Sequence, residues 1–360
     1  MRRIPGVTVM RAGHQRQPVR MLLILALATL PAALPAQTVS ASWPDGFHNT
    51  TPGREPQTRD LLPWLWGRLT GPAIRHAPDE IARQPVDVAR LHQRVDGLRV
   101  TWLGHSTVLI EIDGFRVLTD PVFSERASPF SWLGPRRLTP LPVDPARLPH
   151  IDAVLISHNH HDHLDVGSLR QLARQPGGAP AVYVPLGDDD WLREDGIPQV
   201  QALDWWQQVT LGPARITFVP AQHWSRHITR RGRDRSLWGG HVLQVGAVSV
   251  YHAGDTGYGP DFKAIGDRLG PFTLALLPIG AYQPRWLTRR QHIDPAEAVQ
   301  AHRDLRARQS LGVHWGSFVL SDEPIQQPPG DLAEARRAAG LSEDEVMTWA
   351  IGETRSWSAP

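Results

Sequence analysis

The sequence has 360 residues, of which 41% are hydrophobic and 21% are charged. This composition is typical of a soluble globular protein, and the length predicts one α/β domain of roughly 250–300 residues with extensions rather than two separate domains. Because the chain has no cysteine, disulfide bonds, thiolate zinc sites and a cysteine nucleophile are excluded.

The first 36 residues carry the pattern of a secretory signal. They contain five arginines and no acidic residue, and the apolar run Met21–Leu30 follows the arginines. A signal peptide cleaved after Ala36 or Ala41 is therefore expected over residues 1–36, with an uncleaved N-terminal anchor as the alternative. This predicts an exported protein that is periplasmic or envelope-associated. Without the five arginines the formal charge of +2 becomes −3, so no basic surface predicts nucleic-acid binding.

Residues 37–96 are rich in proline and are expected to wrap around the folded domain as an extended or partly helical arm. We interpret the tryptophans of the segment Leu61–Trp66 as packing anchors, and a lipid-facing role is the alternative. The folded domain is expected over residues 97–355.

The domain begins with strand-like residues over 98–120. Two or three strands are expected there, with Asp113-Gly114 as a hairpin turn and Asp120 at the end of the last strand. The remaining elements follow from apolar runs, alternation and helical spacing between breakers. In chain order they are strand 152–156, helix 166–174, strand 181–185, helix 188–195, strands 209–211, 216–219, 240–245 and 247–251, helix 260–269, strand 274–278, helix 294–307, strand 310–314 and helix 331–339.

The helix expected from residue 294 has a clear start signal. Asp294 is placed as its cap, Pro295 lies in the first turn and Glu297 occupies the capping-box position. Strands interleaved with helices in two halves predict two mixed sheets packed face to face, with helices outside.

The strand 152–156 is followed by a loop that contains His158, His160, Asp162 and His163 within six residues. Neutral imidazole and carboxylate are the ligands that zinc and similar divalent ions prefer. Alternation directs His158 and His160 to one ion, and Asp162 and His163 then face a second ion. A solvated loop that is merely rich in histidine is the alternative, and the restrictive HxHxDH pattern disfavours it.

Three further candidate ligands follow predicted strands. His223 comes after strand 216–219, Asp255 after strand 247–251, and His314 ends strand 310–314. Each residue alone is a weak signal, because an isolated His or Asp at a strand end is commonly structural or merely exposed. Together with the loop, they supply enough ligands for two ions.

The HxHxDH pattern and the order of these residues resemble the metallo-β-lactamase superfamily. The resemblance implies the αββα sandwich, an α/β fold of four layers in which the metal loops gather along one edge. It also implies that Asp120 accepts the N–H of a ligand histidine and so orients its ring. The two predicted metal shells are His158, His160, His223 and Asp255 on one ion, and Asp162, His163, His314 and the bridging Asp255 on the other.

Two ions about 3.5–4 Å apart can lower the pKa of a shared water and polarise a phosphoryl or carbonyl oxygen. The expected reaction is therefore hydrolysis of an ester, lactone, amide or phosphodiester, in which Asp162 orients the attacking hydroxide and Asp255 holds both ions. Two Zn²⁺ ions are the expected cofactors, and iron or manganese at one position stays open.

Six further segments resemble N-acylphosphatidylethanolamine-hydrolysing phospholipase D, and the similarity runs from roughly Gly97 to Leu341. Membership of that family implies that a phosphodiester in a membrane lipid is cleaved to an N-acylethanolamine and phosphatidic acid. The segments are Trp102–Val108, Leu118–Pro129, Gly134–Arg137, Ala253–Tyr258, Gly280–Trp286 and Val313–Phe318.

The same resemblance suggests substrate contacts. His292 matches a histidine that faces the substrate, and we assign it to the phosphate or the leaving group as a catalytic residue; an exposed His before a helix cap is the alternative. His105 either lines the site or is structural. For the tryptophans, core packing is the alternative to a lipid groove. The remaining candidate walls and contacts are Trp132, Trp224, Tyr282, Trp286 and Leu287.

Two other functions stay open. One is a lactonase or phosphodiesterase for a soluble sugar phosphate or nucleotide, which polar residues around the cleft would favour. The other is a non-catalytic metal-binding envelope protein, which would need a missing ligand or a blocked water position. A phospholipid or other phosphodiester is the expected partner, with peripheral membrane contact, and a homodimer stays open.

Overall fold

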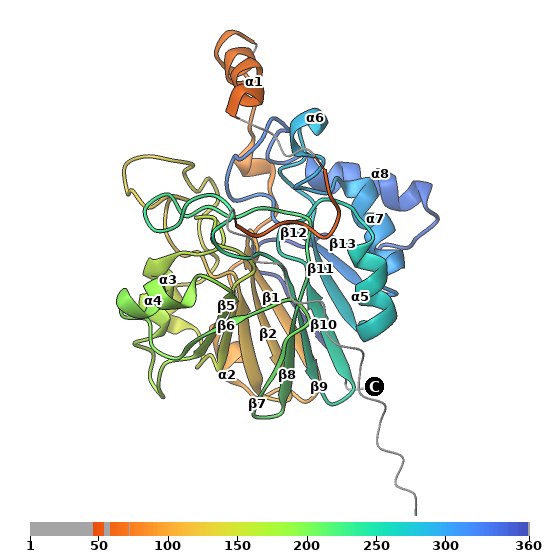
Figure 1. The fold of residues 1–360 in the computed structure, drawn as a ribbon. Coiled ribbons are helices and arrows are strands. Elements are labelled where there is room, and N and C mark those ends of the chain that lie inside the picture. Colours follow the sequence, from red (N-terminus) through yellow and green to blue (C-terminus); the bar gives the residue numbers. More distant parts are fainter. Residues whose placement is uncertain (1–45, 54–57, 72, 359–360) are drawn as a thin grey trace, which may run out of the picture. The chain divides into compact units, whose positions relative to one another are not determined.

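Two seven-stranded sheets form the centre of the computed structural model (Figure 1), which describes residues 46–53, 58–71 and 73–358. These residues all belong to one compact unit, residues 38–360. The predicted signal or anchor, residues 1–36, lies outside the described residues. No helix in the described ranges combines the length and the apolar character needed to cross a bilayer.

The strand order is β14-β1-β2-β3-β4-β5-β6 in the first sheet and β13-β12-β11-β10-β9-β8-β7 in the second. The first sheet consists of β1 (Leu98–Gly104), β2 (Thr107–Ile112), β3 (Phe115–Thr119), β4 (Ala153–Leu155), β5 (Ala181–Pro185), β6 (Val200–Leu203) and β14 (Thr354–Trp357). The second consists of β7 (Gln208–Leu211), β8 (Ala214–Val219), β9 (Gly240–Val245), β10 (Val248–His252), β11 (Leu274–Pro278), β12 (Ser310–Val313) and β13 (Val346–Met347).

Both sheets change from antiparallel to parallel pairing along their width. Strands β1, β2 and β3 are antiparallel and β3 to β6 are parallel, while β7 to β10 are antiparallel and β10 to β13 are parallel. Parallel neighbours need crossover connections. Because neighbouring parallel strands run in the same direction, the carboxyl ends of β3 and β4 lie at one edge of the first sheet. Those of β10, β11 and β12 lie at one edge of the second sheet.

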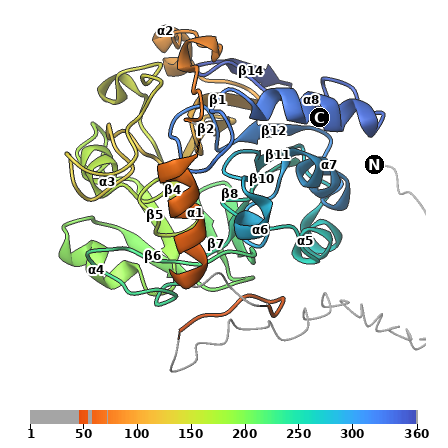
Figure 2. The same cartoon turned by 90° about the horizontal axis from the view of Figure 1, so that it is seen from above.

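Helices cover the outer faces of the sandwich. Helices α3 (Val166–Leu172) and α4 (Asp189–Glu194) lie outside the first sheet, and α5 (Asp261–Leu269), α7 (Pro295–Asp304) and α8 (Pro328–Ala338) lie outside the second (Figure 2). Helices α1 (Thr58–Thr70) and α6 (Arg285–Thr288) lie at one end of the sandwich in Figure 1. The short α2 (Val88–His92) and the 3₁₀ turns Pro78–Glu80 and Pro145–Arg147 complete the set.

Alternation along the strands explains the two cores. Successive side chains of a strand point to opposite faces, so Ile110 packs between the sheets while its neighbour Leu109 packs beneath the helices. The second core also contains Leu169 of α3 and Trp191 of α4. Side chains buried on both faces of the first sheet require helices on its outside, which confirms the predicted sandwich with outer helices.

The described part of the arm packs on both cores. Phe47 and Ile81 belong to the cluster that contains Ile110 and extends to α5 and α7, and Leu91 belongs to the core beneath α3 and α4. At the other end of the chain, β14 pairs with β1 and extends the folded domain to Trp357, two residues beyond the expected boundary at 355. The capping box at Asp294, Pro295 and Glu297 is present as predicted.

Candidate metal centre

The predicted metal ligands all lie on loops that follow strands. The loop with His158, His160, Asp162 and His163 follows β4, and the other three ligands follow β8, β10 and β12. Within the ranges that the structure describes, four overlapping groups of His and Asp bring ligand atoms within 4.8 Å of one another. The fold thus gathers all seven candidates, although they are separated by up to 156 positions in the sequence.

One group consists of three imidazoles. Nδ1 of His160 lies 2.8 Å from Nε2 of His158 and 3.2 Å from Nε2 of His223. His158 and His223 are almost fully buried. Three ring nitrogens that converge at these spacings form one half of the centre, the imidazole half.

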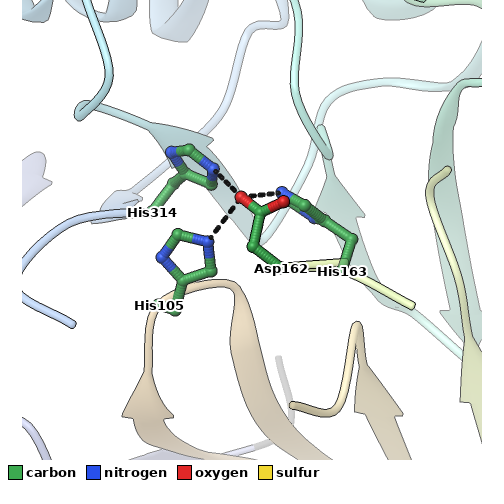
Figure 3. Close-up of side chains that lie close together, drawn as sticks. All are labelled: His105, Asp162, His163 and His314. Carbon is green, nitrogen blue, oxygen red and sulfur yellow. Dashed lines mark hydrogen bonds and ion pairs between the residues drawn. The ribbon is translucent and has the colours of Figure 1, made fainter. Parts of the chain in front are cut away.

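The second group contains a carboxylate. Oδ2 of Asp162 lies 3.4 Å from Nε2 of His314, 3.6 Å from Nε2 of His163 and 3.2 Å from Nε2 of His105 (Figure 3). Four side chains from three separate loops therefore point toward one another. We call Asp162, His163 and His314 the carboxylate half of the centre.

Asp255 lies between the two halves. Its Oδ1 is 3.1 Å from Nε2 of His314, and its Oδ2 is 3.2 Å from Nε2 of His163. The same Oδ2 is 3.9 Å from Nε2 of both His158 and His223. One carboxylate therefore reaches ligand atoms of both halves, as a bridging ligand would.

Donor type and spacing fit divalent metal ions. With metal–nitrogen distances of roughly 2.0–2.1 Å, ligand atoms of a tetrahedral ion lie roughly 3.3–3.4 Å apart, and most of the spacings above are close to this value. Moreover, three of the converging atoms described above are buried without a hydrogen-bond partner among the described residues, namely Nε2 of His163, Nε2 of His314 and Oδ1 of Asp255. Unpartnered buried nitrogen and carboxylate oxygen atoms that face one another are the features expected of a metal site.

The two halves differ in their electrostatics. In the imidazole half, burial disfavours the imidazolium and lowers the pKa of His160 to about 3, and the pKa values of His158 and His223 lie well below the usual value. In the carboxylate half, Asp255 and Asp162 raise the pKa of His314 to about 9 although burial opposes this, and they hold the pKa of His163 well above its usual range.

Asp120 connects the carboxylate half to the strands beneath it. Its Oδ2 accepts hydrogen bonds from Nδ1 of His163 and Nε2 of His252, both at 2.8 Å, and Ser157 donates to the same carboxylate from its backbone and its hydroxyl, each at 2.7 Å. His163 and His252 hold the pKa of Asp120 below its usual range, so the carboxylate is charged. Because Nδ1 of His163 is engaged, its Nε2 is directed at the metal centre.

Sequence reasoning missed two contacts that fix His223. Asn49 of the arm pairs with the His223 backbone, donating from Nδ2 to the carbonyl at 2.8 Å and accepting from the N–H at 2.9 Å. The ring of His223 is oriented by the Gln291 carbonyl, 2.9 Å from its Nδ1. No periodic pattern marks Asn49, and a backbone carbonyl carries no sequence signal, so neither contact was predictable.

A pocket of about 310 Å³ opens onto the centre. Of the predicted wall residues, Trp224 and Leu287 line it together with Trp64 of α1. Four candidate ligand or catalytic residues also line the pocket, namely His160, Asp162, Asp255 and His292. The other lining residues are Arg226, Arg233, Ala281, Gln283, Thr288, Gln291, Leu320 and Ser321.

The other predicted contacts lie outside the pocket lining. Tyr282 is buried and its hydroxyl donates to Asp331, so it does not face the pocket. Trp132 and Trp286 are 72% and 62% exposed and do not line the pocket. His105 is buried against Asp162, so it contacts the carboxylate half rather than the open pocket.

His292 lies at the edge of the centre. Its Nδ1 is 3.8 Å from Oδ2 of Asp255, and its ring centroid is 5.2 Å from that of His223. Burial lowers the pKa of His292 to about 4, so the ring is neutral near pH 7. A neutral imidazole at the pocket wall can donate or accept one hydrogen bond at each nitrogen.

Comparisons with known proteins agree with this arrangement. Residues 115–315 match the family model described as "Beta-lactamase superfamily domain". The solved structure of Igni18, a metallo hydrolase from Ignicoccus hospitalis, aligns with a TM-score of 0.55 at 24% identity, covering 73% of this chain and 99% of that chain. The chain belongs to the metallo-β-lactamase superfamily and is a metal-dependent hydrolase.

Two relatives give a closer comparison. An uncharacterised protein of Mycobacterium tuberculosis is 43% identical over 259 residues, which cover 71% of this chain and 66% of the relative. A Caenorhabditis elegans protein named N-acyl-phosphatidylethanolamine-hydrolyzing phospholipase D 1 is 37% identical over 279 residues, which cover 73% of this chain and 76% of the relative. The predicted resemblance to homologues with this name is thus confirmed.

Proposed function

We propose that the protein is a phospholipase D-type phosphodiesterase that cleaves N-acylphosphatidylethanolamine-like lipids to an N-acylethanolamine and phosphatidic acid. The observation that carries this proposal is the pocket, which places Asp162, Asp255 and His292 beside the apolar walls of Trp64 and Trp224. The name of the nematode relative supports the same substrate class.

The pocket size indicates which part of a lipid would enter. A volume of about 310 Å³ lies at the lower end of the roughly 300–1,000 Å³ that hold drug-sized ligands. It suits a head group with its phosphodiester and not a pair of acyl chains. The acyl chains would then remain outside, against the rim of the pocket.

The rim offers apolar side chains for such contact. Helices α1 and α6 both contribute to the pocket wall, through Trp64 and Leu287, and each carries a largely exposed tryptophan, Trp66 at 68% and Trp286 at 62%. Tryptophan suits the interface between membrane and water because its ring is apolar and its N–H is polar. We therefore propose peripheral membrane contact at this rim.

Two metal ions at the centre would lower the pKa of a water and polarise a phosphoryl oxygen. Around them, Asp162 and Asp255 supply the carboxylates that hold and orient the reacting groups. His292 presents Nδ1, a buried atom without a hydrogen-bond partner in the described part of the chain, toward Asp255. We assign the His292 ring to the phosphate or the leaving oxygen, because it is neutral and lines the pocket.

We further propose Zn²⁺ for both positions, because imidazole and carboxylate ligands suit this ion, with iron or manganese at one position as the alternative. An exported, periplasmic or envelope-associated location is likewise our proposal, based on the basic and apolar pattern of residues 1–36.

The test is release of N-acylethanolamine from vesicles that contain N-acylphosphatidylethanolamine, measured by mass spectrometry. Metal-loaded protein should form product, whereas a chelated sample and Asp162→Asn should lose roughly a thousandfold or more of the rate, because transition-state charge stabilisation by metal ions amounts to several kcal/mol. Asp267→Asn, an exposed carboxylate on α5, is the matched control and should retain the full rate.

The contradicting result is equally specific. Absence of product from protein that holds two metal ions per chain, by elemental analysis, would overturn the lipid substrate. Turnover of a sugar phosphate, nucleotide or lactone by the same sample would then identify the alternative class. The polar wall residues Gln283 and Gln291 are the feature that favours this alternative.

A further inference from the structure

The charge balance of the pocket points to an anionic ligand. The only carboxylates in its lining are Asp162 and Asp255, both of which face the metal centre. The lining also contains two guanidinium groups, on Arg226 and Arg233. With two divalent ions in place, these carboxylates are committed to the ions, so no lining carboxylate remains to balance either arginine.

Arg226 differs from the other arginines of its loop. Arg230 pairs with Asp195, and Arg231 pairs with Asp190. Among residues 46–53, 58–71 and 73–358, Arg226 makes no hydrogen bond and no ion pair to another side chain or to the backbone. A guanidinium has five N–H donors, and those of Arg226 are thus available to a ligand in the pocket.

Arg233 holds the second guanidinium at the same wall. Its guanidinium carbon lies 4.5 Å from the ring centroid of Trp224, and its Nε is 3.3 Å from Oδ2 of Asp234. Stacking on Trp224 and the ion pair with Asp234 fix this group in place. The charge of Arg233 is therefore compensated by Asp234, while Arg226 keeps all of its donors free.

The backbone on both sides of Arg226 is held firmly. The hydroxyl of Ser225 donates to the Ser236 carbonyl at 2.5 Å, and the Ser225 carbonyl accepts from the N–H of Asp234 at 2.8 Å. On the other side, the buried ring of His227 packs between those of His161 and Trp191, with centroid distances of 4.3 and 4.7 Å. Arg226 thus projects from a fixed point three residues after His223, a residue of the imidazole half.

We propose that Arg226 is a specificity-determining residue that binds the phosphate of the substrate. A guanidinium can donate two parallel hydrogen bonds to a phosphate, which a neutral ester or lactone carbonyl cannot accept in the same way. The pocket therefore selects anionic phosphodiesters over neutral esters. This inference rests on the proposed function, because it concerns the same pocket and the same reaction.

The test compares two chromogenic substrates of metal-loaded protein, the anionic bis(4-nitrophenyl) phosphate and the neutral 4-nitrophenyl acetate. Arg226→Gln should raise KM for the phosphodiester roughly tenfold or more, since a hydrogen bond to a charged group is worth about 1.5–3 kcal/mol. The same variant should leave kcat/KM for the acetate within about twofold, because no anion is bound in that case. Arg226→Lys should recover part of the loss, because lysine keeps the charge and not the paired donors.

Arg230→Gln is the matched control, because Arg230 belongs to the same loop but pairs with Asp195 and does not line the pocket. Arg230→Gln should leave KM unchanged for both the phosphodiester and the acetate. Equal losses on both substrates in Arg226→Gln, or an unchanged KM for the phosphodiester, would overturn the role of Arg226.

A binding measurement separates this inference from the proposed function. If the wild-type protein cleaves no phosphodiester, the proposed function fails, and titration calorimetry with inorganic phosphate then tests Arg226 directly. Metal-loaded wild-type protein should bind phosphate roughly tenfold more tightly than Arg226→Gln. Equal affinities would show that Arg226 does not recognise phosphate.

Discussion

The imidazole half and the carboxylate half of the metal centre use the same kind of residue in opposite electrostatic states. His160 is buried with other imidazoles, and its pKa falls to about 3. His314 is more deeply buried, yet it lies 3.1 Å from Asp255, and its pKa rises to about 9. The difference teaches that the balance between burial and direct contact with carboxylates decides whether a ligand histidine carries a proton before a metal ion binds.

This difference separates the two halves in their response to metal ions. A metal ion can enter the imidazole half without displacing protons, because those rings are already neutral near pH 7. Entry into the carboxylate half requires the loss of protons from His163 and His314. Without ions, the carboxylate half is an ion network that balances its own charge, whereas the imidazole half consists of neutral rings that contact one another and the Gln291 carbonyl.

The largest expected effect comes from removing one ligand from each half. His223→Ala and His314→Ala should each lower kcat/KM on the phosphodiester roughly a thousandfold or more, because a two-metal reaction loses one of its ions. Elemental analysis should find about one ion per chain in each variant instead of two. His92→Ala, a histidine exposed on α2, is the control. Two retained ions in either variant would contradict the assigned shells.

A second prediction concerns the pH dependence of the metal-free protein. The pKa of His314 lies above the unfolded value near 6.5, so its stabilising contribution is complete below pH 6.5 and is lost as pH rises through about 9. The pKa of His160 lies below the unfolded value, so the folded protein loses stability as pH falls from 6.5 toward 3. Stability without metal should therefore peak near pH 6.5.

Thermal unfolding with a chelator at pH 6.5, 7.5 and 9 measures this dependence. The free energy of unfolding should fall by on the order of 2–3 kcal/mol between pH 6.5 and pH 9, while the metal-loaded protein gains stability as ligand protons are lost. The gap between the two samples should thus widen toward pH 9. His314→Gln should flatten the slope of the chelated protein, and a chelated wild-type protein that becomes more stable toward pH 9 would refute the charge assignment.

Local patterns in the sequence indicated ligands of both halves, since the HxHxDH pattern holds two residues of each. The carboxylate half depends on Asp162, His163 and Asp120, which stand in or beside strong local patterns, and the structure brings these three together. The alternation and spacing of the strands likewise predicted the two sheets. Both signals are local, because side-chain period and strand-end position depend on neighbouring residues only.

Contacts between distant segments were not predictable in the same way. Asn49 and His223 are 174 positions apart, and only the folded arm brings them together. Tyr282, in the segment Gly280–Trp286, was expected to contact the substrate. Its hydroxyl instead donates a hydrogen bond to Asp331 of α8. The short polar strand β14 has no alternation of its own and is defined by its pairing with β1. Such features depend on tertiary packing, which overrides local preference.

The smallest expected effect tests the arm contact that supports the imidazole half. Asn49→Ala removes both hydrogen bonds to the His223 backbone and the one from the Trp238 indole, which Asn49 accepts at 2.9 Å. Loss of outer contacts typically weakens a metal site 10–100-fold, and we expect about tenfold here because the Gln291 carbonyl still orients the ring. Competition with a chromogenic chelator measures the affinities of the two ions separately. Asn49→Asp keeps the oxygen that accepts hydrogen bonds from His223 and Trp238, so it should lose less metal affinity than Asn49→Ala. A tenfold loss of affinity for one ion only would show that the arm supports the imidazole half alone. Equal losses of affinity for both ions would show that Asn49 stabilises the fold in general.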